Sequence, residues 1–106
     1  MTITMKTEGT AATLHVEGWL DTQSSPDLGK AVKALPEETA ALILDFKKLE
    51  YISSSGLRQV VAAYKKMKDK NGTFSVIHVG NEVMDVFRLT GFDKKLDIRS
   101  AGEVIR

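Results

Sequence analysis

By its length, a chain of 106 residues holds one hydrophobic core, and its 42% apolar and 27% charged residues are typical of an ordinary soluble protein. The formal charge of +1 excludes a general electrostatic attraction to nucleic acid or anionic lipid, and the absence of cysteine excludes disulfides and thiolate chemistry. The amino-terminal Met1–Lys6 lacks the apolar core of a signal peptide, and no apolar run approaches the ~20 residues of a membrane span. We therefore expect a single cytoplasmic domain over residues 1–106.

A hairpin is predicted at the start of the chain. Apolar residues alternate with polar ones on either side of a turn at Glu8–Thr10, and the alternating positions are Ile3, Met5, Leu14 and Val16. A period of two residues is typical of strands with one buried face. We expect two strands joined by this turn.

A bend and a helix are predicted after the hairpin. Gly18 permits the bend, and Trp19 is interpreted as a core residue rather than an exposed contact. Asp21 or Thr22 is a candidate cap for the next element. The Ser24–Asp27 segment combines a cap candidate, a proline in the first turn and an early acidic residue, which together indicate a helix start. The buried face of this helix consists of apolar residues before Pro36, namely Leu28, Ala31, Val32 and Leu35.

Three serines lie between a predicted strand and a predicted helix. The apolar run Ala40–Leu44 indicates a strand near residues 40–46 that is buried on both faces. After the serines, apolar residues recur at the spacing of one helix face, at Leu57, Val60, Val61, Tyr64 and Met67. This helix is expected to end at Lys70–Gly72. Ser53, Ser54 and Ser55 are therefore expected at a helix N-terminus.

Two interpretations of these serines are compatible with each other. A serine hydroxyl at the N-cap accepts a hydrogen bond from an unpaired backbone N–H and contributes about 1 kcal/mol, which is the favoured interpretation. A cap needs only one serine, however, and the unpaired N–H groups and the helix dipole tolerate an added anion. A phosphorylated serine at this position would change the surface while leaving the fold intact.

The second half of the chain is expected to hold two further strands and two further helices. Their apolar positions are Phe74, Val76 and Ile77 for a strand, Val83, Val86, Phe87 and Leu89 for a helix, and Leu96 and Ile98 for a short strand. Asn81 is the expected cap of the helix, Thr90–Gly91 its end, and Ser100–Ile105 one or two last helical turns. This order predicts a single α/β domain: a mixed, mostly parallel sheet with an N-terminal hairpin and about four helices.

The residue patterns of enzymes are mostly missing. Ser53–Leu57 has neither the glycines and lysine of a phosphate-cradling loop nor the elbow of a serine nucleophile. His15 and His78 fall in separate predicted strands, where a packed or surface imidazole is favoured over a base or a metal ligand. Asp21 and Asp45 are explained as cap and strand-end residues. We expect no catalytic residues, no metal and no nucleotide or other cofactor.

Four segments together resemble a known family along nearly the full length. They are Val16–Asp21, Leu42–Phe46 with Leu49, Tyr51–Leu57 and Leu89–Lys94. The chain resembles a STAS domain of the bacterial anti-sigma factor antagonists. The Tyr51–Leu57 match is the most specific, because it corresponds to the phosphoacceptor segment of that family. There an Asp or Ser precedes the phosphorylated Ser or Thr, and a small residue and a glycine follow.

The resemblance implies a site when it is transferred residue by residue. The phosphoacceptor corresponds to Ser54, followed by Ser55 and Gly56. Ser53 stands where well-characterised members carry Asp, which removes a negative charge beside the acceptor. Asp21 matches an acidic position of the family's partner-binding surface. The implied partner-binding residues are thus Asp21, Ser53, Ser55 and Gly56.

The resemblance also implies a partner switch. The dephosphorylated domain would bind an anti-sigma factor that is also an ATP-dependent serine kinase, and so release a sigma factor. Phosphorylation of Ser54 would end that binding, and a separate serine phosphatase would restore it. The alternative is a non-phosphorylated module of the same fold, such as an accessory subunit of a membrane transport or lipid-transport complex. An enzyme or nucleotide-binding protein is a third, less favoured hypothesis.

Overall fold

The predicted hairpin forms one edge of the sheet in the computed structural model, which describes residues 1–101. Strand β1, Thr2–Glu8, pairs antiparallel with β2, Ala11–Leu20. Gly9 has a φ of +61° in the turn between them, a conformation that glycine adopts without steric cost. The hairpin prediction is confirmed.

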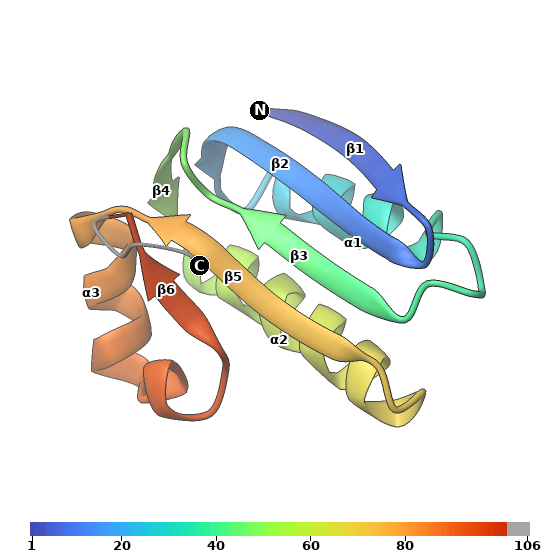
Figure 1. Cartoon of the computed structure of the whole chain (residues 1–106). Helices are drawn as coiled ribbons and strands as arrows, with labels where there is room; N and C mark the ends of the chain where they lie inside the picture. Colours follow the sequence, from blue (N-terminus) through green and yellow to red (C-terminus); the bar gives the residue numbers. More distant parts are fainter. Residues whose placement is uncertain (102–106) are drawn as a thin grey trace.

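The remaining elements are a mixture of strands and helices (Figure 1). In chain order they are α1 (Ser25–Lys33), β3 (Ala41–Asp45), β4 (Leu49–Ile52), α2 (Ser54–Asp69), β5 (Thr73–Val79), α3 (Asn81–Thr90), the 3-10 turn η1 (Phe92–Lys94) and β6 (Ile98–Ser100). The main sheet has the order β1-β2-β3-β5-β6, and β4 pairs with the far end of β2. All pairings except that of the hairpin are parallel. The mixed, mostly parallel α/β sheet predicted from the sequence is confirmed.

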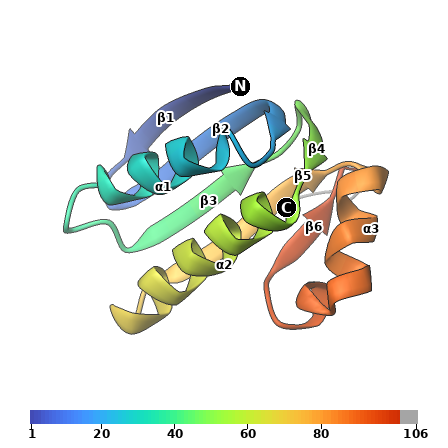
Figure 2. The same cartoon turned by 180° about the vertical axis from the view of Figure 1, so that it is seen from behind.

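The hydrophobic core lies between the sheet and the helices. Both views show α1 and α2 on the same face of the sheet (Figures 1 and 2). The strand residues buried in this core include Leu14, Val16, Leu42, Leu44 and Val76, and the helix residues include Leu28, Val32, Val60 and Met67. Over β2, β3 and β5 the opposite face of the sheet carries no helix within residues 1–101 (Figures 1 and 2). Ala41 and Ile43 of β3 are therefore only half-buried, and the prediction that this strand is buried on both faces is wrong.

Strand β4 was not predicted from the sequence, which placed these residues in the connection before the serines. Its four residues show the pattern buried, exposed, exposed, buried instead of the alternation of a half-buried strand. Its pairing with β2 shifts register between Gly18 and Trp19, because Gly18 pairs with Leu49 and Trp19 with Tyr51, which leaves Glu50 as an extra residue in β4. Gly18 has a φ of +94° and donates a 3.0 Å hydrogen bond to the carbonyl of Lys48. A short strand whose alternation is broken by a bulge has no local signature.

Two further expectations need correction near the end of the chain. Asn81 is the first residue of α3 rather than its cap, because Gly80 takes the cap position without a side-chain hydrogen bond. Ser100 belongs to β6 instead of a last helix, and residues 102–105 of that predicted helix lie outside the described residues. The helix end at Gly91 is confirmed, with a φ of +78°. No helix in the described range 1–101 is long and apolar enough to cross a membrane.

Candidate functional site

Ser53 caps the helix that follows β4. Its backbone is extended, with φ −91° and ψ 173°, and its hydroxyl accepts a 3.1 Å hydrogen bond from the backbone N–H of Gly56. An extended backbone and an acceptor for the third N–H are the features of an N-cap serine. The capping task expected for one of the three serines is therefore performed by Ser53.

Ser54 and Ser55 do not cap the helix, and they differ in exposure. Ser54 is the first residue of α2 and is exposed, whereas Ser55 is half-buried. The first turn, Ser54–Leu57, contains no acidic residue that would already occupy the positive end of the helix dipole. The Ser54 hydroxyl has no hydrogen-bond partner among the residues that the structure describes, so it is available for reaction or contact.

Gly56 permits a close approach between the first turn of α2 and the end of β2. A Cβ atom on Gly56 would lie 2.7 Å from the carbonyl oxygen of Leu20 and 2.8 Å from its Cγ, which is closer than side-chain carbons pack. Gly56 is buried and has no side chain, so it can position the serines but offers no side-chain contact to a binding partner. A larger residue would push the serine segment away from β2.

Asp21 is held in a tight turn between β2 and α1. Its Oδ1 accepts hydrogen bonds from the backbone N–H groups of Gln23 at 3.1 Å and Ser24 at 3.0 Å, and the Ser24 hydroxyl lies 2.9 Å away. The backbone N–H of Ser24, and after it the Ser24 hydroxyl, lower the pKa of the Asp21 carboxyl below its ordinary value. Asp21 is therefore a negative charge at neutral pH.

The structure brings the Asp21 turn and the serine segment together. The backbone N–H of Ser53 donates a 2.9 Å hydrogen bond to the carbonyl oxygen of Leu20, the residue before Asp21. This bond extends the parallel pairing of β2 and β4 to the last residues of both strands. The five residues that the sequence assigned to a site thus lie at one end of two neighbouring strands.

Trp19 is exposed, so its interpretation as a core residue is wrong. Its side chain is 57% exposed, and its ring packs against that of Tyr51, which is 46% exposed, at a centroid distance of 5.3 Å. The two residues are register partners on β2 and β4. Exposed neighbouring aromatic rings are typical of protein-binding surfaces. The sequence held a signal for this orientation. Successive side chains of a strand point to opposite faces, so Trp19 lies on the face opposite to the buried Leu14, Val16 and Leu20.

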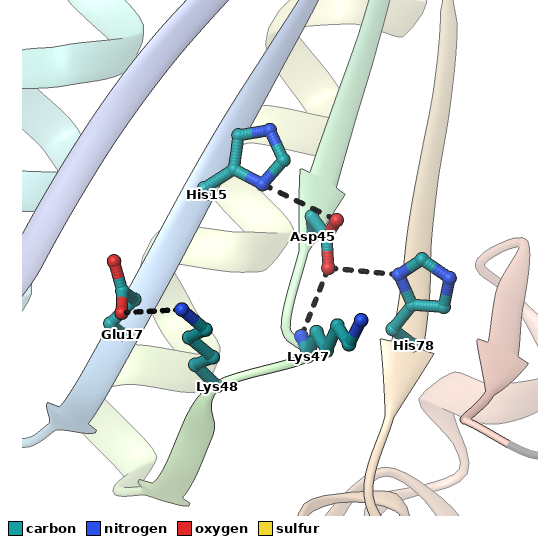
Figure 3. A network of polar contacts seen from close by, with 6 residues as sticks. All are labelled: His15, Glu17, Asp45, Lys47, Lys48 and His78. Carbon is teal, nitrogen blue, oxygen red and sulfur yellow. Dashed lines mark hydrogen bonds and ion pairs between the residues drawn. The ribbon is translucent and has the colours of Figure 1, made fainter.

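A second group of polar residues was missed because it comes from three separate strands (Figure 3). Asp45, which ends β3, lies with Oδ2 3.3 Å from Nδ1 of His15 and with Oδ1 3.0 Å from Nδ1 of His78. Its Oδ1 also accepts a 2.9 Å hydrogen bond from the backbone N–H of Lys47. The two histidines, expected to be unrelated surface or packed residues, share one carboxylate.

Neither group of residues is arranged as a metal centre. Within residues 1–101, no group of three or more histidine, cysteine or acidic side chains is placed to hold a metal ion. The rings of His15 and His78 both direct Nδ1 to Asp45, and their Nε2 atoms point away from each other (Figure 3). The serine segment offers a capping hydroxyl on Ser53 and an exposed hydroxyl on Ser54.

Comparison with known proteins places the fold and the serine segment in a family. The model of the STAS domain family matches residues 2–103. The chain belongs to the STAS domain family. An anti-sigma-B factor antagonist from Bacillus subtilis (strain 168) is 27% identical to this STAS domain over 90 residues, which cover 85% of this chain and 83% of the relative. The family resemblance inferred from the sequence is confirmed.

Solved structures agree with this assignment. An anti-sigma factor antagonist from Mycobacterium paratuberculosis has a TM-score of 0.82 at 27% identity, and the match covers 92% of this STAS domain and 84% of that protein. The Bacillus cell fate determinant SpoIIAA gives a TM-score of 0.67 in its phosphorylated form, at 16% identity and with 92% and 90% of the two chains covered. Its unphosphorylated form gives 0.66 at 14% identity, with 89% and 97% covered. The likeness to SpoIIAA shows the fold alone.

Proposed function

We propose that this STAS domain is an anti-sigma factor antagonist whose activity is switched at Ser54. With an unmodified Ser54 it binds an anti-sigma factor that is also a serine kinase, and phosphate on Ser54 ends that binding. A serine phosphatase returns it to the binding form. In this proposal the protein is a binding protein of the cytoplasm and not an enzyme. The relatives that carry the antagonist name support the general role.

The observation that carries the proposal is the division of tasks between the first two serines. Ser53 is the cap, and Ser54 beside it is exposed with a hydroxyl that no described residue engages. A kinase can reach such a hydroxyl without opening the helix. The structure of SpoIIAA in both a phosphorylated and an unphosphorylated form supports the same kind of modification on this fold.

The local charges favour a switch that acts on binding and leaves the fold unchanged. A phosphate adds about −1.5 to −2 charges at neutral pH, and the N–H groups at the start of α2 stabilise it. The same phosphate increases the negative charge of a surface that already holds Asp21, whose pKa is lowered by its turn. A docked partner would have to desolvate that charge, and a loss of about 1.4 kcal/mol already weakens binding tenfold.

The exposed rings of Trp19 and Tyr51 provide the apolar part of the proposed partner surface. Both come from the strand ends that lead into the Asp21 turn and the serine segment. Aromatic residues are enriched among the few interface residues that contribute most of the binding free energy. We include Trp19 and Tyr51 in the partner surface with Asp21, Ser53 and Ser55.

The proposal is tested by capture followed by phosphate transfer. Immobilised Ser54→Ala protein should retain from the native lysate a protein that binds the Ser54→Asp variant much less. With ATP, the retained protein should phosphorylate the wild-type domain, and peptide mapping should place the phosphate on Ser54. Transfer to Ser53 or Ser55 in preference to Ser54 contradicts the proposal, as does a retained partner that binds both variants equally.

A further inference from the structure

A hollow of about 360 Å³ lies on the sheet face away from α1 and α2, separate from the serine site. Its lining includes Thr4 and Lys6 of β1, His15 of β2, Asp45 and Lys47 at the end of β3, and His78 of β5. Figure 3 shows both imidazoles turned toward Asp45 and the Lys47 side chain extended toward His78. None of its lining residues belongs to the Asp21 turn or to Ser53–Gly56. The hollow has no task in the proposed switch.

The Asp45 carboxylate lies between the Nδ1 atoms of both imidazoles. The Asp45 side chain is 10% exposed, and its two oxygens lie 3.0 Å and 3.3 Å from the Nδ1 atoms of His78 and His15. The contact between His78 and Asp45 is a hydrogen bond, and an ionised carboxylate accepts such a bond but cannot donate it, so His78 carries a proton on Nδ1, while Nδ1 of His15 lies at ion-pair distance from the same carboxylate. This leaves Nε2 of each ring as the atom that can meet a ligand, as an acceptor when neutral and as an N–H donor when protonated.

The position of His78 depends on an irregular backbone. The pairing of β5 with β6 shifts register between Val76 and Val79, and His78 has a φ of +56°. Between these pairs β5 has one residue more than β6. This extra residue allows Val76 and Val79 both to remain in the core while His78 lies over Asp45. Bulges often redirect a side chain at functional sites, and a non-glycine residue in the left-handed region is uncommon. The irregular backbone of β5 therefore sets the position of the His78 side chain.

Positive charge exceeds negative charge around the hollow. The three lysines Lys6, Lys47 and Lys48 face two acids, which leaves one positive charge in excess, or three when both histidines are protonated. Glu17 already has Lys48 at 3.7 Å, and Asp45 already accepts from His78 and from the backbone N–H of Lys47 and lies 3.3 Å from Nδ1 of His15. The ammonium groups of Lys6 and Lys47 form no ion pair with any residue in the described part of the chain.

We propose that this hollow binds a small doubly charged oxyanion, specifically a phosphate ion or the phosphate group of a small monoester. Its oxygens would accept hydrogen bonds from Nε2–H of His78 and from the ammonium groups of Lys6 and Lys47, whereas Nε2 of His15 points away from that of His78 (Figure 3), so His15 contributes through its charge. A bound anion favours the protonated imidazoles, and the ionised Asp45 between them compensates part of the added positive charge. The volume of about 360 Å³ leaves room for a phosphate group together with the organic part of a small monoester.

The first test changes the charge of the protein while the charge of the ligand stays constant. Sulfate keeps two negative charges from about pH 6 to about pH 8, whereas imidazoles lose their protons over this range. At constant ionic strength, NMR titration with sulfate should shift the His15 and His78 resonances, with an affinity at least about fivefold lower at the higher pH. Glycerol phosphate should shift the same resonances. Shifts with sulfate alone contradict the monoester part of the proposal, and equal affinities for sulfate at both pH values contradict the role of the histidines.

Matched substitutions show whether the site or the overall charge binds the anion. Lys6→Gln and His78→Gln should each lower the sulfate affinity at least about threefold, and His78→Gln should reduce its pH dependence. Lys65→Gln removes the same charge from the exposed side of α2 and should leave the affinity unchanged. His15→Gln provides a second imidazole variant in regular strand, and thermal melts confirm that each variant is folded. An equal loss with Lys65→Gln, or unchanged binding by both histidine variants, overturns the proposal.

Discussion

The hydroxyl oxygen of Ser53 accepts a 3.1 Å hydrogen bond from the backbone N–H of Gly56, and this bond makes Ser53 the cap of α2. The family resemblance of the Tyr51–Leu57 segment implies an Asp at this position in other members, and Asp is an equally good cap residue. The serine in this chain therefore preserves the cap while it removes a charge beside Ser54. In the proposed switch, the residue that caps the helix and the residue that carries the phosphate are therefore two different neighbours.

Ser53→Ala should lower the free energy of unfolding by about 0.5–2 kcal/mol, the usual effect of losing a side-chain cap. Ser54→Ala should change it by less than about 0.5 kcal/mol, because the exposed hydroxyl of Ser54 has no described partner. Urea unfolding of the two variants beside the wild type measures the difference. Equal losses in both variants would show that Ser54 shares the capping task.

Gly56→Ala should destabilise the domain by at least about 1 kcal/mol. An alanine gains about 1 kcal/mol of helix propensity, but its Cβ would lie 2.7 Å from the carbonyl oxygen of Leu20, a backbone atom that cannot rotate away. Overpacking of this kind typically costs about 1–3 kcal/mol, and the loss of the close approach to β2 adds to it. The free-energy cost of the clash therefore exceeds the gain in helix propensity.

Gly29→Ala is the matched control for the Gly56 substitution. Gly29 is also a helical glycine whose added Cβ meets an atom at 2.7 Å, but that atom is Oε1 of the Gln59 side chain. A flexible side chain moves aside, so this variant should be neutral or more stable by up to about 1 kcal/mol. Thermal melts of both variants decide the point, and a stable Gly56→Ala protein would contradict the close-approach argument.

The core and the element order were predictable because they follow from local periodicity. The alternation at Leu14 and Val16, the apolar run of β3 and the spacing of Leu57 and Val60 each appear within one segment. Strand β4 was not predictable in this way, because the extra residue Glu50 breaks its alternation and the strand exists through its pairing with β2. Trp19 was misplaced for a related reason, since its ring partner Tyr51 lies on that unpredicted strand.

The candidate site was predictable only where one segment or the family resemblance carried it. Ser53, Ser54 and Gly56 are neighbours in sequence, and their place at a helix start follows from the pattern after them. The group around Asp45 depends on strand register, because His15 is its register partner across two strands that are far apart in the sequence. His78 reaches Asp45 only through a bulge with a φ of +56°, which no residue pattern indicates.

Asp21→Asn should remove a pH-dependent part of the stability. The pKa of Asp21 in the folded chain lies below the ordinary value of 3.8 because the Ser24 N–H and hydroxyl favour the ionised form. The contribution of this carboxylate is therefore complete above the unfolded pKa and is lost as the pH falls through the folded pKa. Urea unfolding at about pH 7 and about pH 3 should show a difference between wild type and variant that shrinks on acidification. A difference that grows on acidification would contradict the lowered pKa.

Trp19→Ala should weaken binding of the captured anti-sigma factor by about tenfold or more, because a central aromatic residue typically contributes about 2 kcal/mol or more to an interface. Its effect on the free energy of unfolding should stay near 1 kcal/mol, since the side chain is 57% exposed and loses mainly its contact with Tyr51. Leu89→Ala removes another exposed apolar side chain, 87% exposed on α3, and should leave the affinity unchanged. If Leu89→Ala weakens binding as much as Trp19→Ala does, the aromatic pair is not the specific apolar contact.

Ser54→Asp should leave the fold intact and abolish most partner binding. The substituted carboxylate would occupy the first position of α2, where no acidic residue now stands and where the helix dipole favours an anion, so stability should be unchanged or rise by a few tenths of a kcal/mol. The same charge would lie in the partner surface with the ionised Asp21, and the affinity for the captured anti-sigma factor should fall at least about tenfold. Ser54→Ala is the matched variant and should melt and bind like the wild type. Thermal melts beside binding titrations separate the two effects: a Ser54→Asp domain that unfolds, or one that binds as tightly as Ser54→Ala, would show that surface charge at this serine is not the switch.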